Sequence, residues 1–147
     1  MKKITSFEGR YEFLSNFAVS PIFYEGEQYP TVEHAYQALK ANKEEDRLAI
    51  QQLPTPGKAK RMGRKIEMRP DFEKIKLEVM KKCLREKFKE GSHLADKLLS
   101  TGDSLLVEGN DWGDKLWGMV IENKTYVGEN LLGLMLMEIR FDLTKKS

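Results

Sequence analysis

Three polar side chains suited to acid, base or anion chemistry recur at helical spacing in "YPTVEHAYQALK", residues 29–40. Glu33, Gln37 and Lys40 stand at i, i+4 and i+7, so a helix would align them in one row. A row that faces solvent is an ordinary polar surface. A row that faces a cleft lets Glu33 act as a general acid or base, and lets Lys40 bind an anion or trap a carbonyl group.

A second stretch, "EGNDWGDKLWG", residues 108–118, sets acids beside indoles among several glycines. The glycines predict a loop whose backbone can approach a ligand closely. A tryptophan offers a face on which a base can stack, which contributes about 1–3 kcal/mol per base. A neighbouring carboxylate can stabilise an oxocarbenium-like centre or activate a water molecule. The combination fits cleavage of a bond between a sugar and a base.

Two alternatives for this loop stay open. Tryptophans buried in a core would fix an acidic loop that has no chemistry of its own. Clustered carboxylates would also suit a magnesium ion, although no second carboxylate motif in the sequence supports that site. The acids concerned are Glu108, Asp111 and Asp114.

Two weaker signals lie near the ends of the chain. In "GRYEFLSNF", residues 9–17, the apolar side chains Phe13, Leu14 and Phe17 are expected in the core. Ser15 and Asn16 between them fit a core less well, because buried polar groups need partners, and they can present a hydroxyl and an amide to a sugar. In "GENLLG", residues 128–133, the amides that open an apolar helix can meet an anion, although ordinary capping gives the same pattern.

The net charge of +2, from 25 basic and 23 acidic residues, is too balanced for a protein that coats nucleic acid. The charge is uneven along the chain. Residues 58–69, "KAKRMGRKIEMR", hold one acid among many basic residues, whereas residues 108–114 are acidic. A basic cluster and an acidic cluster suit a substrate with both a phosphate and a centre of developing positive charge. Two solvated surface patches would give the same pattern.

Length and composition limit the class of protein. A chain of 147 residues predicts one domain, residues 1–147, that buries roughly 70% of the surface of its unfolded chain. Cys83 is the only cysteine, which excludes an internal disulfide, and with two histidines it disfavours a zinc site. The start, "MKKITSFEGR", lacks the apolar stretch of a signal peptide, and no window reaches 18 apolar residues. We therefore expect a soluble cytoplasmic protein.

Most of the chain predicts helix. The expected helices cover residues 31–41, 43–53, 55–64, 70–91, 92–101 and 129–140. Thr31, Thr55 and Ser92 are expected N-caps, and the last helix is apolar nearly all round, so it should be buried. A hairpin is expected at "PIFYEGEQY" and a strand at "SLLVEG". The fold class is α+β, with helices dominant and a small sheet.

Two reactive side chains on these helices are expected to be structural. Cys83 falls on the apolar stripe of the long helix, so a small buried hydrophobic residue is favoured over a nucleophile. His34 points about 100° away from Glu33 on a helix, which disfavours a direct catalytic role.

Five stretches, in this order, resemble the NADAR family, also called YbiA-like proteins. They are "FEGRYEFLSNF", "YPTVEHAYQALKA", "TPGKAKRMGR", "LLSTGDSLLVEGNDWGDKLWG" and "GENLLGLMLMEIR". The resemblance spans residues 7–140 and implies a single, mainly helical α+β domain with N-glycosidase activity. Members of the family are linked to hydrolysis of the C–N bond in ribosylamino-pyrimidine intermediates of riboflavin synthesis, and others to removal of ADP-ribose from guanine bases.

Carried over residue by residue, the resemblance makes Glu33 and Asp114 the expected acid/base pair, with Lys40 as a third catalytic candidate. The expected substrate-binding residues are Arg10, Ser15, Asn16, Lys60, Arg64, Trp117 and Asn130. Among these, Trp117 should stack on the base, and Lys60 and Arg64 should meet the phosphate. The expected substrate is a phosphorylated N-riboside or an ADP-ribosylated guanine, free or in nucleic acid, and the reaction requires no metal or redox cofactor. The alternative is a module that binds ADP-ribose or a nucleotide without cleaving it.

The chain departs from the family pattern at one point. Where the family often has arginine, one residue and then Asp-Trp, this chain has Arg69, Pro70, Asp71 and Phe72. If the family's indole touches the substrate, the phenyl ring of Phe72 would weaken stacking or change the preferred base.

Overall fold

The computed structural model describes residues 2–146, and within them the fold is mixed α/β, with seven helices and short two-stranded sheets. This confirms the predicted α+β class with helices dominant. The small sheet is divided into three separate strand pairs in this part of the chain. The chain forms two compact units: a central unit, Asn16–Lys87, and a terminal unit made of Met1–Ser15 and Phe88–Ser147.

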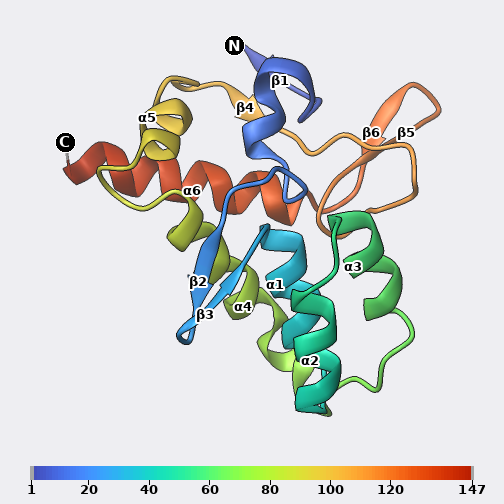
Figure 1. The fold of residues 1–147 in the computed structure, drawn as a ribbon. Coiled ribbons are helices and arrows are strands. Elements are labelled where there is room, and N and C mark those ends of the chain that lie inside the picture. Colours follow the sequence, from blue (N-terminus) through green and yellow to red (C-terminus); the bar gives the residue numbers. More distant parts are fainter. Residues whose placement is uncertain (1, 147) are drawn as a thin grey trace. The chain divides into compact units, whose positions relative to one another are not determined.

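Helices dominate the central unit (Figure 1). Its elements are β2 (Ile22–Tyr24), β3 (Glu27–Tyr29), α1 (Val32–Leu39), α2 (Glu44–Gln51), α3 (Pro56–Gly63) and α4 (Phe72–Lys87). Helix α1 contacts α2, α3 and α4, and β2 packs against α4. Side chains on several sides of α1 are therefore covered by other helices. This packing determines whether the polar row on α1 is buried.

Local sequence explains where these elements begin and turn. The β2–β3 hairpin turns at Glu25 and Gly26, which both have positive φ, as a tight two-residue hairpin turn requires. Thr31 caps α1 by accepting a hydrogen bond from the amide of His34 at 3.0 Å. Thr55 caps α3 in the same way, with Pro56 in its first turn. These predictions are confirmed.

Helix α4 buries the predicted apolar stripe, in which Phe72, Val79, Met80, Cys83 and Leu84 are buried. The Phe72 ring packs edge-on against Tyr36 of α1, with ring centroids 5.4 Å apart. Phe72 is a core residue, so it does not offer a stacking face to a substrate. Burial raises the pKa of the Cys83 thiol to about 12, which makes a nucleophilic thiolate unfavourable, as the sequence predicts.

The terminal unit combines its two chain segments through a parallel strand pair. Its elements are β1 (Lys3–Ile4), η1 (Gly9–Leu14), α5 (His93–Leu99), β4 (Leu105–Leu106), β5 (Val120–Glu122), β6 (Thr125–Val127) and α6 (Leu131–Lys146). In the pair, Lys3 lies opposite Leu105 and Ile4 opposite Leu106. Ser92 caps α5 as predicted, accepting from the amide of Ala95.

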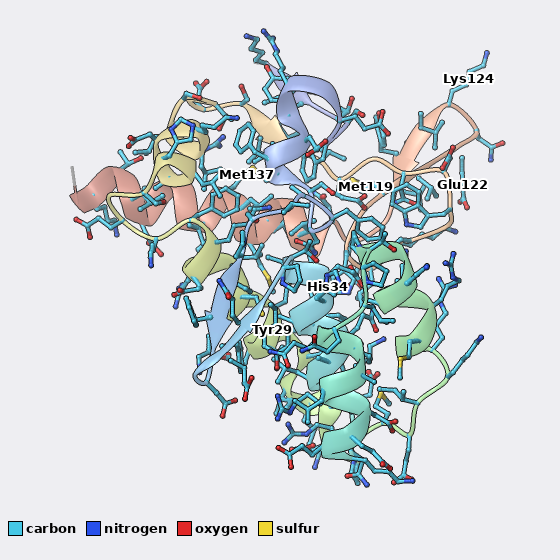
Figure 2. The ribbon with its side chains drawn as sticks, viewed as in Figure 1. Tyr29, His34, Met119, Glu122, Lys124 and Met137 are labelled. Carbon is cyan, nitrogen blue, oxygen red and sulfur yellow. The ribbon has the colours of Figure 1, made fainter. Side chains whose placement is uncertain are left out.

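The β5–β6 hairpin was not predicted. Its turn is formed by Asn123 and Lys124, both with positive φ, and the side chain of Lys124 projects outward at its tip (Figure 2). The alternation in "VIENKTYV" around an asparagine is the signal that could have predicted it. Lys115, in the loop before β5, forms an ion pair of 2.6 Å with Glu122.

Helix α6 corrects one prediction. It buries Leu132, Met135, Leu136, Ile139 and Leu143 but leaves Leu134 and Phe141 exposed. Within the terminal unit, α5 and β4 pack against this helix. Its apolar residues extend beyond the surface that is buried, so the prediction of a helix buried all round was wrong. None of the helices in residues 2–146 has the length and apolar character needed to cross a bilayer.

Candidate functional site

The polar row on α1 is buried. Glu33 is 8% exposed and Gln37 is 5% exposed, while Lys40 at the end of the helix is half-buried. A solvated surface row is therefore the wrong interpretation of the "VEHAYQALK" spacing. Burying a carboxylate and an amide costs free energy unless they are hydrogen-bonded. The hydrogen-bond partners of Glu33 and Gln37 therefore indicate why these side chains are buried.

Gln37 and Glu33 are hydrogen-bonded to each other. Nε2 of Gln37 donates to Oε2 of Glu33 at 2.5 Å, one helical turn away. Oε1 of Gln37 is buried and has no hydrogen-bond partner within residues 2–146. The amide therefore has one identified contact, and that contact fixes the Glu33 carboxylate.

Gly63 makes room for this amide. A Cβ built on Gly63 would collide with Oε1 of Gln37 and come within 2.7 Å of its Cδ. Helix α3 can approach α1 this closely only because residue 63 has no side chain. The sequence motif "KRMGR" therefore contributes a required glycine as well as positive charge.

Helix α3, which packs against α1, carries basic side chains. Burial lowers the pKa of Lys40 below its ordinary value of 10.5; the charge of Glu33 opposes this shift and that of Arg64 adds to it. Lys60 and Arg64 are one helical turn apart on α3, and Arg64 is exposed. These positive charges lie on the segment that packs against α1, an arrangement suited to a phosphorylated ligand.

Asn16 and Phe17 precede this helical core and extend the cluster. The backbone carbonyl of Asn16 accepts from the amide of Glu33 at 3.1 Å. The Asn16 side chain is buried, donates weakly to the sulfur of Met80 at 3.6 Å, and has no partner for Oδ1 among residues 2–146. Phe17 is 42% exposed, so its predicted place in the core was wrong.

Phe17 is a candidate contact residue that sequence analysis missed. Lys60 Nζ lies 5.9 Å from the centroid of its ring, which puts an exposed aromatic face beside a predicted phosphate-binding cation. The strongest sequence signal was the neighbouring pair Ser15 and Asn16, whose polar character is unusual between apolar residues.

His34 has a structural role. Nε2 lies 2.9 Å from the carbonyl oxygen of Leu53, and Nδ1 lies 2.8 Å from Oγ1 of Thr31. A carbonyl only accepts hydrogen bonds, so Nε2 carries a proton and donates to Leu53, while Nδ1 shares a hydrogen bond with the threonine hydroxyl. Both ring nitrogens are used, and His34 ties the start of α1 to the segment before α3 (Figure 2).

In the terminal unit, Asp114 organises the loop of residues 108–118. Its Oδ1 accepts from the amides of Leu116 at 3.0 Å and Trp117 at 2.9 Å. Asn110 accepts from the amide of Asp114 and donates to its carbonyl oxygen. The carboxylate of Asp114 therefore shapes the loop, and any chemistry it performs must be compatible with these two bonds. The role of Asn110 was missed; its spacing of four residues from Asp114 across a glycine was the available signal.

The same loop occupies the beginning of α6. The amides of Asn130, Leu131 and Leu132 donate to the carbonyls of Gly118, Leu116 and Trp117. These amides are the ones that "GENLLG" was expected to offer to an anion. Of the two interpretations of "GENLLG", ordinary capping therefore holds, because carbonyls of the loop accept from these amides.

Asn130 and the tryptophans complete this region. Asn130 is buried; Oδ1 accepts from the amide of Glu108, and Nδ2 donates to the carbonyl of Leu106. Both ends of its amide are thus engaged inside the terminal unit. Trp117 is half-buried, whereas Trp112 is 58% exposed, so the indole that sequence analysis did not select presents the larger exposed surface.

Arg10 and Ser15 lie around η1. The Arg10 guanidinium lies 4.9 Å from the centroid of the Tyr11 ring. Ser15 follows the last turn of η1, and its amide donates to the carbonyl of Glu12 at 2.8 Å. Arg10 lines a cavity whose wall contains neither Asp114 nor Trp117.

The predicted residues fall in both units. Asn16, Glu33, Lys40, Lys60 and Arg64 gather in the central unit. Asp114, Trp117 and Asn130 gather in the terminal unit. Across the part of the chain that is described, no three His, Cys, Asp or Glu side chains are grouped as a metal ion would require, so the magnesium alternative gains no support.

Comparison with known proteins assigns this chain to a family. The NADAR domain matches residues 5–144. N-glycosidase YbiA of Escherichia coli (strain K12) is 40% identical over 135 residues, which cover 90% of this chain and 82% of that protein. An N-glycosidase of Nostoc punctiforme is 33% identical over 138 residues, which cover 90% of this chain and 86% of that protein. The NMR structure of E. coli YbiA matches with a TM-score of 0.84 and 38% identity, covering 99% of this chain and 88% of the other.

The chain therefore belongs to the NADAR family. With relatives named N-glycosidases over most of its length, it is an N-glycosidase, a hydrolase of bonds between a sugar and a nitrogen. A riboflavin biosynthesis protein of Vibrio vulnificus is also 35% identical over 133 residues, which cover 89% of this chain and 35% of that protein. A binding module without catalysis is disfavoured by these relatives.

Proposed function

We propose that this enzyme hydrolyses the C–N bond between a ribose phosphate and a heterocyclic base and releases the free base. The observation that carries the proposal is the buried Glu33 carboxylate, fixed by Gln37 at 2.5 Å, in a helical unit whose neighbouring helix carries Lys60 and Arg64. The relatives named N-glycosidase and riboflavin biosynthesis protein support a small N-riboside as the substrate.

In the proposed mechanism, Glu33 and Asp114 are the candidate acid and base. Water attacks the anomeric carbon, and the electron pair of the C–N bond moves to the departing nitrogen. One carboxylate takes the proton from the water or stabilises positive charge on the sugar. The other group, as an acid, protonates the nitrogen. Lys60 and Arg64 bind the phosphate, and an indole of the loop, Trp117 or the more exposed Trp112, stacks on the base.

A panel of substrates scored by released base tests this proposal. The panel contains a ribosylamino-pyrimidine phosphate and ADP-ribosylated guanosine, with the matching bases detected by chromatography. We expect one of the two to be cleaved at least a hundredfold faster than the other. Saturable binding of both compounds without release of base would contradict the proposal and favour a binding module.

Lys40 offers a covalent variant of the mechanism. Its Nζ adds to C1 of the ring-opened sugar, the base leaves as its amine, and water then hydrolyses the Schiff base. Borohydride added during turnover should reduce that Schiff base to a stable secondary amine, found by mass spectrometry at Lys40. Burial lowers the pKa of Lys40, so its amine loses its proton at a lower pH than an ordinary lysine does. The amount of adduct should therefore rise with pH already below 10.5. Lys40→Arg keeps the charge and should give no adduct.

Gln37 is proposed to position Glu33, and Gly63→Ala tests this without altering either residue. The added methyl group should displace the Gln37 amide and break its bond to Glu33, because Cβ would meet Oε1 and Cδ of that side chain. We expect kcat to fall at least tenfold with KM nearly unchanged. The midpoint of thermal unfolding should change little, since alanine favours a helix over glycine by about 1 kcal/mol and offsets part of the steric cost.

Gly57→Ala is the matched control for this variant. Gly57 lies in the same helix, and a Cβ there would have no atom within 4 Å. Its kcat should equal that of the wild type. If Gly63→Ala also keeps full kcat, Gln37 has no positioning role.

A further inference from the structure

The terminal unit contains a cavity of about 400 Å³ whose wall includes Arg10, a predicted substrate-binding residue, and none of the groups used in the mechanism proposed above. Its wall is formed by Lys2, Ile4, Arg10, Tyr11, Phe13, Lys97, Ser100, Thr101, Asp103 and Ser104. The volume lies in the range of pockets that hold small-molecule ligands. We propose that this cavity binds the phosphate group of a small metabolite.

The charge of the wall supports an anion. Three cationic side chains, Lys2, Arg10 and Lys97, face one carboxylate, Asp103. Among residues 2–146, the ion pairs that the structure shows include none of these three cations. A cavity with an excess of uncompensated positive charge concentrates anions.

A second cavity of similar size provides an internal comparison. It lies in the central unit, measures about 410 Å³, and also has three cations in its wall, Lys43, Arg47 and Arg69. All three are paired with carboxylates: Lys43 with Glu67, Arg47 with Glu44, and Arg69 with Asp71. The cations of this second cavity therefore form ion pairs with carboxylates, whereas among residues 2–146 the three cations of the terminal cavity form none.

Aromatic rings hold two of the unpaired cations at the wall. The Arg10 guanidinium lies 4.9 Å from the centroid of the Tyr11 ring, and Lys97 Nζ lies 4.6 Å from the centroid of the Phe13 ring. Cation–π contacts orient a positive group without neutralising its charge. An arriving phosphate would therefore meet cations that are already positioned, which lowers the entropy cost of binding.

A buried guanidinium adds positive charge behind the wall. Arg140 is 9% exposed and donates from Nη1 to Oγ1 of Thr101 at 2.8 Å and from Nη2 to the carbonyl of Ser104 at 2.9 Å. Both acceptors belong to residues that line the cavity. Burial lowers the pKa of Arg140, and the charge of Asp103 opposes this shift. Arg140 thus supports two wall residues and extends the positive potential inward.

Two hydroxyl groups of the wall, those of Tyr11 and Ser104, remain for the ligand. Thr101 Oγ1 donates to the carbonyl of Leu98, and Ser100 Oγ donates to the carbonyl of Lys97. These two protons are used within the end of α5. Ser104 lines the cavity between them and β4, so its hydroxyl can donate to a phosphate oxygen, as can that of Tyr11.

Titration with inorganic phosphate, followed by amide shifts in ¹H–¹⁵N NMR spectra, tests the site. We expect saturable shifts at Thr101 and Ser104, and no such shifts with chloride at the same ionic strength. Lys2→Gln combined with Lys97→Gln should weaken phosphate binding at least tenfold. Lys145→Gln is the matched control, because Lys145 Nζ lies over the Phe141 ring at 4.5 Å, in the same unit but outside the cavity wall.

Three results would overturn the site: shifts that do not saturate, equal shifts with chloride, or unchanged affinity in the doubly substituted protein. Because binding is measured without turnover, failure here leaves the proposed glycosidase mechanism untouched. Steady-state kinetics then show whether the site holds the phosphate of the substrate or that of a separate metabolite. If phosphate raises KM alone and the double substitution removes this effect, the site holds the phosphate of the substrate. An effect on kcat that the double substitution removes assigns it to a separate metabolite.

Discussion

Glu33→Gln is expected to lower kcat by about 10²- to 10⁴-fold, the range typical for loss of a general acid or base. The substitution keeps the size and hydrogen-bonding shape of the side chain. Its carbonyl oxygen can still accept from Nε2 of Gln37, the bond that measures 2.5 Å in the wild type. The fold should therefore survive, and the loss should fall on turnover rather than on binding. Steady-state rates with the cleaved member of the substrate panel measure this effect.

Glu27→Gln is the control that isolates the chemistry. Glu27 also accepts a hydrogen bond from a glutamine, because Nε2 of Gln51 donates to its Oε2 at 3.1 Å in the same unit. That pair lies outside the α1 row, so the substitution should leave kcat unchanged. Full activity of Glu33→Gln would eliminate Glu33 as an acid or base. An equal loss in Glu27→Gln would point to a general effect of lost charge.

Asp114→Asn and Asp114→Ala are expected to separate chemistry from loop structure. Asparagine retains Oδ1, which accepts from the amides of Leu116 and Trp117. Asp114→Asn should therefore keep the loop and lose activity by about 10²-fold or more if the carboxylate takes part in the reaction. Asp114→Ala removes both hydrogen bonds and should also destabilise the protein by about 1–2 kcal/mol, as loss of a capping side chain does.

Thermal unfolding and kcat together decide between the two roles of Asp114. If Asp114→Asn has wild-type activity while Asp114→Ala is impaired, Asp114 serves only the loop. If both variants lose activity but only the alanine variant loses stability, the carboxylate is catalytic.

Much of the local structure follows from neighbouring residues and was predicted correctly. Thr31, Thr55 and Ser92 cap helices because each accepts from an amide three residues further along the chain. The turn at Glu25 and Gly26 depends on two residues that adopt positive φ. Such features involve contacts within a few residues, so the sequence carries their cause directly.

The alignment of Glu33, Gln37 and Lys40 also followed from sequence, because helix geometry fixes which residues share a row. Whether that row was buried did not follow. Its burial depends on the close approach of α3 to α1, which Gly63 permits from a position distant in the chain. The sequence left a solvated row and a buried row both open, and long-range packing decided for burial.

The tertiary structure also reassigned residues whose side chains have two possible uses. The Asn130 side chain hydrogen-bonds to the backbone of Leu106 in β4 and of Glu108 in the loop. The first amides of α6 donate to loop carbonyls. Phe17 is exposed instead of buried. The pairing of β1 with β4 joins segments about a hundred residues apart. The sequence by itself determined the helices, their caps and the types of group that can do chemistry. Only the tertiary structure decided which of those groups are buried, engaged or exposed, because burial and hydrogen bonding depend on partners that the chain brings together from a distance.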